Sequence, residues 1–165
     1  MKKVWCVLVL ALLLSGCSGG KTLETVTDVQ DVSVMAQMKQ VHVSLPSDAS
    51  VETLENGANE KIYLCDGYTV SVQILPGGDT ERTFRELTGF SKEQLTLMQR
   101  QNGNYSRYDC VWSAAGEGED LVARCTVLDD GSFHYAVTVC APFSDAGDLS
   151  KTWQNILSSV TLSTD

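Results

Sequence analysis

Four cysteines have the most distinctive chemistry in this 165-residue chain: Cys65, Cys110, Cys125 and Cys140. In an exported domain, an even number of cysteines suggests disulfide bonds, here two bonds with three possible connectivities. The alternative is four buried free thiols that act as small apolar residues on strands. No C-x-x-C pair is present, which argues against a thioredoxin-type redox role and against a structural zinc site.

The other reactive residue types give no catalytic pattern. His42 and His134 fall in predicted strands, and we expect each to be a surface or half-buried strand residue rather than a catalytic base. The chain contains no G-x-S-x-G elbow, no H-E-x-x-H motif and no phosphate-binding glycine loop. Acidic residues gather near two turns: Glu117, Glu119, Asp120, Asp129 and Asp130. These turns lie at opposite ends of one predicted strand, so we expect no calcium site, no other metal and no cofactor.

The elements that must position three of the cysteines lie in residues 105–141, which are predicted to form an antiparallel meander. Its strands are expected at residues 105–113, 121–128 and 133–140, because each stretch is rich in β-branched and aromatic residues. Turn residues join them at 116–119 and at 129–131, where Asp130-Gly131 can supply the positive φ of a tight hairpin. Both faces hold apolar residues, so we expect other elements to cover both faces.

The first turn decides how two cysteines meet. If it is an even loop centred on Glu117-Gly118, Cys110 faces Cys125 across the two strands, with their side chains on the same face. This register favours a Cys110–Cys125 disulfide and leaves Cys65 and Cys140 as the second pair. An odd loop would break the match. The register of the third strand is ambiguous by one residue, so the face that holds Cys140 stays open.

The rest of the chain supplies further strands and three predicted helices. We expect strands at 39–45, 51–54, 61–65 and 68–75, with an Asp66-Gly67 hairpin turn between the last two. Asp79 or Thr80 can cap a helix that ends at Gly89. The S-x-x-Q pattern from Ser91 predicts a second helix that contains residues 95–98. A last helix is predicted from about residue 148, with this apolar stripe: Leu149, Trp153, Ile156, Leu157 and Val160.

The front of the chain is typical of an export signal. Lys2 and Lys3 precede an apolar run at 4–14 that is too short for a stable membrane span. It ends in Leu14-Ser15-Gly16-Cys17, which resembles the bacterial lipobox. That resemblance implies cleavage before Cys17 and attachment of a diacylglyceryl group to its thiol, with palmitate among the acyl chains of the anchor. Each buried CH₂ then contributes about 0.8 kcal/mol to anchoring. The alternative is an ordinary secretory signal in which a cysteine follows a small residue.

These observations divide the chain into a signal peptide at 1–16, a flexible tether at 17–37 and a single α+β domain at 38–165. An element that already begins in residues 32–38 is the alternative for the end of the tether. Removal of Lys2 and Lys3 takes the net charge from −9 to −11. A chain this acidic is not expected to bind nucleic acid through its phosphates.

The predicted order of elements resembles the PsbP-like and DcrB-like α/β/α sandwiches, in which helices pack on an antiparallel sheet. The resemblance is carried by residues 84–90 (FRELTGF), 135–142 (YAVTVCAP) and 153–160 (WQNILSSV), and it spans about residues 37–162. Members of this group include an extrinsic photosystem subunit, a nuclear-import factor that binds a small GTPase, and bacterial envelope lipoproteins. What they share is mostly non-catalytic binding, and fold alone does not give function.

We therefore expect a non-enzymatic lipoprotein, anchored to the bacterial cell membrane through Cys17 on its extracytoplasmic side. In a host with two membranes the outer membrane can hold the anchor. Its domain would bind an envelope protein partner or assist envelope assembly. The alternatives are a small-ligand-binding lipoprotein with a pocket between helices and sheet, and an enzyme without a recognisable motif.

Overall fold

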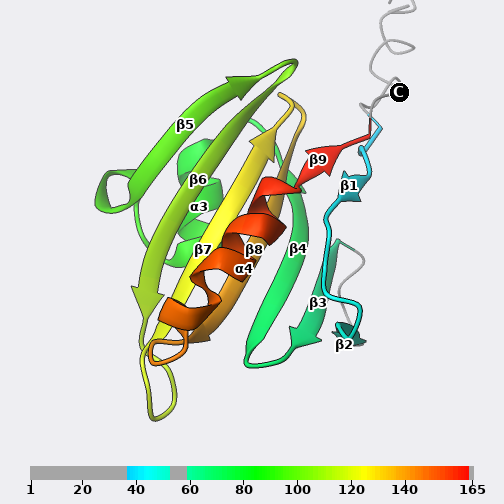
Figure 1. Cartoon of the computed structure of the whole chain (residues 1–165). Helices are drawn as coiled ribbons and strands as arrows, with labels where there is room; N and C mark the ends of the chain where they lie inside the picture. The colour runs from blue at the N-terminus through cyan, green and yellow to red at the C-terminus, as the bar shows by residue number, and fades with distance from the viewer. Residues whose placement is uncertain (1–36, 53–58, 164–165) are drawn as a thin grey trace, which may run out of the picture. The chain divides into compact units, whose positions relative to one another are not determined.

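The computed structural model describes residues 37–52 and 59–163. In this part of the chain an antiparallel sheet has the strand order β2-β3-β4-β8-β7-β6-β5. Helix α3 packs on one face of the sheet and helix α4 on the other (Figure 1). The predicted α+β class, an antiparallel sheet with helices packed on it, is therefore confirmed.

The strands of the large sheet are β2 (Ser50–Glu52), β3 (Glu60–Cys65), β4 (Tyr68–Pro76), β5 (Thr96–Asn102), β6 (Tyr105–Ala114), β7 (Leu121–Asp129) and β8 (Phe133–Pro142). The helices are α3 (Thr80–Thr88) and α4 (Ala146–Ser158), and a short 3-10 turn, η1, spans Lys92–Gln94. Two further strands, β1 (Val41–His42) and β9 (Thr161–Leu162), pair with each other outside the large sheet.

The predicted meander is β6, β7 and β8. The first turn is an even loop, so Cys110 lies opposite Cys125 as the register predicts. The register of the third strand, which the sequence left open by one residue, is defined by two pairs. Cys140 lies opposite Ala123, and Thr138 lies opposite Cys125. Directly opposite residues share a face, so Cys140 lies on the face that also holds Cys110 and Cys125.

The second predicted helix is wrong. The S-x-x-Q capping box does form, with the Ser91 amide donating to Gln94 Oε1 at 2.9 Å. However, only the single 3-10 turn η1 follows, and residues 96–102 form strand β5, paired along its length with β6. A local helix-start signal favours a few residues only, and ladder pairing with a neighbouring strand outweighs it over the next seven.

The predicted strand at 39–45 is also mostly wrong. Only Val41–His42 is strand, and it pairs with Thr161–Leu162 rather than with the large sheet. The segment lies over the α4 side of the sheet, where Val41, Val43 and Leu45 pack against the core. Its alternating pattern therefore reflects packing onto a core surface rather than membership of the sheet.

Each helix covers a separate core. On the α3 side, Phe84 is fully buried and meets Tyr108 edge to face, with ring centroids 5.9 Å apart. Asp79 caps this helix by accepting from the Arg82 amide, and Gly89 ends it in the left-handed conformation, both as predicted. On the other side the apolar stripe of α4 buries Trp153 and its neighbours against the sheet, also as predicted. Among the described residues, no helix combines the length and apolar character of a membrane span.

Candidate functional site

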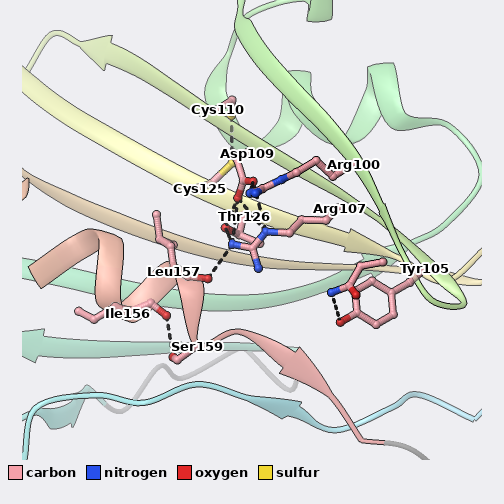
Figure 2. Close-up of polar contacts among 11 residues, drawn as sticks. Arg100, Tyr105, Arg107, Asp109, Cys110, Cys125, Thr126, Ile156, Leu157 and Ser159 are labelled. Carbon is pink, nitrogen blue, oxygen red and sulfur yellow. Dashed lines mark hydrogen bonds and ion pairs between the residues drawn. The ribbon is translucent and has the colours of Figure 1, made fainter. Parts of the chain in front are cut away.

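The densest polar cluster lies between the sheet and the end of α4 (Figure 2). Arg107 of β6 donates from Nε to both oxygens of Asp109, at 3.1 and 3.2 Å. Its Nη2 donates to Thr126 Oγ1 at 3.0 Å and to the Leu157 carbonyl at 2.7 Å. Thr126 Oγ1 in turn donates to Asp109 Oδ1 at 2.7 Å. One arginine thus joins β6, β7 and α4.

The charges in this cluster are arranged to keep Asp109 ionised. Burial acts to raise the pKa of Asp109, but hydrogen bonds from Arg107, Thr126 and Arg100 outweigh it and hold that pKa below its ordinary value. Arg107 also supplies a positive charge at the C-terminal end of α4, which the helix dipole favours, and it shares the Leu157 carbonyl with the Val160 amide. A carboxylate and a guanidinium held this way anchor a helix.

A second set of hydrogen bonds ties the N-terminal segment to the same region. Ser159 Oγ donates to the Ile156 carbonyl at 2.7 Å (Figure 2) and accepts from the Ser44 amide at 2.8 Å. At the start of the segment, the Lys39 amide donates to Tyr135 Oη at 2.9 Å. Gln40 and Ser163 exchange backbone and side-chain bonds, so the chain enters and leaves the described fold side by side.

Cys110 and Cys125 meet as predicted, with their sulfur atoms 3.0 Å apart as two thiols. Cys125 has no exposed surface and Cys110 is also buried, in the α3-side core. The hydrogen bond between the two thiols, together with burial, raises the pKa of Cys125 well above the ordinary thiol value. The structure therefore brings the pair together, and a Cys110–Cys125 disulfide stays a prediction.

Cys65 and Cys140 are not brought together. Cys65 lies opposite Tyr68, whereas Cys140 lies opposite the next residue, Thr69. Since successive residues of a strand point to opposite faces, the two cysteines lie on opposite faces of the sheet. The register speaks against a Cys65–Cys140 disulfide, and the structure describes both as free thiols whose pKa burial raises.

His134 is not the surface or half-buried residue that the sequence suggested, because it is completely buried. Its Nδ1 lies 2.6 Å from Thr83 Oγ1 of α3, and its Nε2 lies 3.6 Å from Asp129 Oδ1. The hydroxyl, imidazole and carboxylate follow the order of a nucleophile, a base and its orienting group, but Thr83 and His134 are both buried in the fold. The contact fixes α3 to β8. His42 is exposed on β1, in line with the prediction.

The acidic residues near the two turns of the meander stay apart, because the turns around Glu119 and Asp130 lie at opposite ends of β7. Asp130 instead accepts backbone amides from Ser132 and Phe133 within its own turn. Within residues 37–52 and 59–163, no group of three or more histidine, cysteine or acidic side chains is placed to hold a metal ion. Cys17 and the proposed signal and tether lie outside the described residues.

A groove of about 200 Å³ lies between the N-terminal segment and strands β3 and β4. Its floor is apolar and is formed by Val41, Val43, Tyr63, Val72 and Ile74. Its polar lining residues include two lysines and one acid: Lys39, Lys61 and Glu60. This groove lies under an extended segment, whereas the ligand pocket expected as an alternative lies between helices and sheet. The volume of the groove is below the roughly 300–1,000 Å³ of most small-molecule sites.

The residues that sequence reasoning missed are Arg107, Asp109 and Thr126. The pattern did place Asp109 on the face opposite Cys110, and an arginine two residues before an aspartate on one strand face was visible. The sequence did not indicate that these residues contact the end of α4, because Leu157 lies 50 residues after Arg107 in the chain.

No family model matches the chain, and a search of curated proteins also finds no match. Solved structures do match in fold. The PsbP protein of a Synechocystis species aligns at 9% identity with a TM-score of 0.53, over 76% of this chain and 92% of that one. A mutant of the protein Mog1 aligns at 10% identity with a TM-score of 0.50, over 76% and 96%.

A protein from Bacteroides thetaiotaomicron aligns at 10% identity and a TM-score of 0.50 over 76% of this chain. This chain spans only about half of that protein, with 46% covered. At such identities the likeness shows the fold alone. The chain therefore has the PsbP-like α+β sandwich that its sequence pattern predicted.

Proposed function

We propose that this protein is a membrane-anchored, extracytoplasmic lipoprotein whose domain is a non-enzymatic binding or assembly module. The observation that carries the proposal is the Leu14-Ser15-Gly16-Cys17 lipobox behind a basic and apolar start. The 21 residues of the tether, 17–37, can span at most about 75 Å when fully extended, which is ample to hold the domain clear of a membrane surface.

The polar groups of the described domain support a binding role rather than catalysis. The Arg107 cluster is used to hold α4, and His134 with Thr83 is used to hold α3. Both cysteines of the close pair lie in the core rather than in a cleft. The fold match to the cyanobacterial PsbP protein is in keeping with the non-catalytic role that the family resemblance implies.

The anchoring step is tested by metabolic labelling with an alkyne analogue of palmitate in a bacterial host, followed by intact mass measurement. The wild-type chain should carry the label, and Cys17→Ser should lose it entirely. Cys6→Ser is the matched control, because it also removes a cysteine from the N-terminal region but leaves the lipobox intact. Label that persists in Cys17→Ser would show that the lipoprotein assignment is wrong.

The binding role is tested by cross-linking the tagged, lipidated protein in cells and identifying what co-purifies, with an unrelated lipoprotein as control. One stoichiometric partner that recurs with this protein and not with the control supports the proposal. Enrichment of nothing beyond the control would count against a protein-binding role.

The groove under the N-terminal segment favours a second candidate, the binding of a small amphipathic acid. Its apolar floor suits a short hydrocarbon chain, and Lys61 can meet a carboxylate at the rim. Octanoate is a suitable probe in an NMR titration. Filling the floor with Val72→Trp should abolish any shift changes, whereas Val51→Trp, at an exposed position outside the groove, should leave them. Equal response in both variants would remove this candidate.

A further inference from the structure

Strand β5 forms one end of the large sheet and pairs only with β6 within the described part of the chain. All of its seven residues except Leu97 are exposed, and it contains neither proline nor glycine. The strand at the other end, β2, has only three residues. A long exposed edge carries a row of N–H and C=O groups without ladder partners, which is a template for another strand. Figure 1 shows β5 at the edge remote from β1.

The hairpin register indicates which backbone groups face outward. Asn102 lies opposite Tyr105 across a two-residue loop, so these two are the closing hydrogen-bonded pair. Hydrogen-bonded and non-hydrogen-bonded pairs alternate along an antiparallel ladder, so we expect Gln99, opposite Tyr108, to be non-hydrogen-bonded. Its amide and carbonyl therefore point to the open edge.

The α4-side face beside this edge carries exposed apolar side chains. Met98 is 59% exposed and Val111 is 42% exposed. Met98 lies opposite Asp109 and Val111 lies opposite Thr96, so the two are diagonal neighbours on one face. An added strand on β5 would place alternate side chains over this pair.

The same face is positively charged in a chain whose net charge is −9. Three arginines lie on it: Arg100, Arg107 and Arg124. Among the paired residues of β5, β6 and β7 that point to this face, Asp109 is the one acid. A cavity of about 250 Å³ opens beside Arg100 and Arg107, and Asn102 and Ser158 also line it. The Arg100 side chain is 57% exposed and bonds Asp109 through one of its terminal nitrogens, so further N–H donors remain to meet an anion.

We propose that β5 binds an extended acidic segment of a partner protein by strand addition. The partner's backbone pairs with the Gln99 edge, one of its carboxylates enters the cavity at Arg100, and an apolar side chain covers Met98 and Val111. A second copy of this chain fits less well. Antiparallel pairing of two β5 strands about Gln99 would set Arg100 opposite Met98 and bring two strongly acidic chains together. This inference rests on the protein-binding role proposed above and adds its surface and its chemistry.

The test is photo-cross-linking in cells with the full lipidated chain. A photoreactive amino acid replaces Met98, and the matched control replaces Leu64, which is also exposed but lies on β3 and on the other face. The linked peptides are then sequenced by mass spectrometry. Position 98 should link to one acidic stretch of one partner, and position 64 should not.

Two variants examine the edge and the charge separately. Gln99→Pro removes an outward amide and Arg100→Glu reverses the charge, and each should reduce the cross-link at least tenfold. Arg82→Glu, on the exposed side of α3, is the control and should leave it unchanged. Circular dichroism confirms folding, and Arg100→Glu decides the matter if Gln99→Pro does not fold. A synthetic peptide of the linked stretch should bind the purified domain at least tenfold more weakly after Arg100→Glu.

The possible failures are distinguishable. Cross-links from position 98 to a non-acidic segment, to a second copy of this chain, or with undiminished yield in both variants would overturn the edge inference. Cross-links from position 64 alone would overturn it while leaving the protein-binding role intact. The absence of any partner at either position and in whole-protein cross-linking would overturn both.

Discussion

The Nη2 of Arg107 lies 2.7 Å from the carbonyl oxygen of Leu157, so a side chain of β6, the strand next to the β5 edge, binds the end of helix α4. Leu157 belongs to the last turn of that helix, where carbonyls have no partner within the helix. The same guanidinium is bonded to Asp109 and Thr126. One residue therefore links the helix to two strands and takes part in a half-buried ion pair.

Arg107→Met should lower the free energy of unfolding by roughly 1.5–3 kcal/mol, because it removes the charge-assisted hydrogen bonds to the half-buried Asp109 carboxylate and to the Leu157 carbonyl. The matched control is Arg100→Met. Arg100 contacts the same carboxylate, but its side chain is 57% exposed, so its loss should cost less than about 1 kcal/mol. Urea unfolding followed by circular dichroism measures both. Similar losses in the two variants would contradict the anchoring role of Arg107.

The contribution of Asp109 to the free energy of unfolding should be larger at neutral pH than at acidic pH. Its pKa in the fold lies below the ordinary value, so its stabilisation is fully present above the unfolded pKa of about 3.9 and is lost as pH falls through the folded pKa. Asp109→Asn should therefore destabilise the protein most near neutral pH, and the difference from wild type should shrink below about pH 4. Unfolding curves at several pH values test this. A difference that grows on acidification would contradict it.

The contact between Thr83 and His134 should be measurable as a coupling between α3 and the sheet. Thr83→Val keeps the shape of the side chain but leaves His134 Nδ1 buried and unsatisfied, which should cost about 1–3 kcal/mol. Thr88→Val on the same helix should cost less, because Thr88 bonds the Phe84 carbonyl within its own helix. Thr83 Oγ1 also donates to the Asp79 carbonyl at 3.2 Å, so a double-mutant cycle with His134→Leu should remove only the part of the Thr83 effect that comes from the imidazole. Additive losses would contradict the direct contact.

Oxidation should distinguish the two pairs of cysteines. After treatment of the folded domain with diamide, a thiol oxidant, Cys110 and Cys125 should be joined to each other because their sulfurs already lie 3.0 Å apart. Cys65 and Cys140 should stay alkylatable after denaturation, because they lie on opposite faces of the sheet. Peptide mapping without reduction gives the connectivity. A peptide that joins Cys65 to Cys140 would contradict the described register.

Two stretches carry similar helix-capping patterns, but only one of them is followed by an α-helix. At Asp79 and at Ser91 the capping pattern is correct in detail, and both caps form. After Asp79 the helix continues, because Phe84 finds a core to fill under α3. After Ser91 it does not, because the chain can pair with β6 instead. A capping pattern indicates where a helix can begin. Whether the helix continues depends on whether a strand further along the chain is available for pairing.

By itself, the sequence determined the features that depend on near neighbours. These are the turns at Asp66-Gly67 and Asp130-Gly131, the caps of α3, the apolar stripe of α4 and the Cys110–Cys125 register, since each is fixed by a few consecutive residues or by one loop length. Only the tertiary structure decided the rest: the strand state of residues 96–102, the face of Cys140, the burial of His134 and the meeting of Arg107 with Leu157. Those features depend on pairing and packing between residues far apart in the chain, where propensity is weak and the partner supplies the energy.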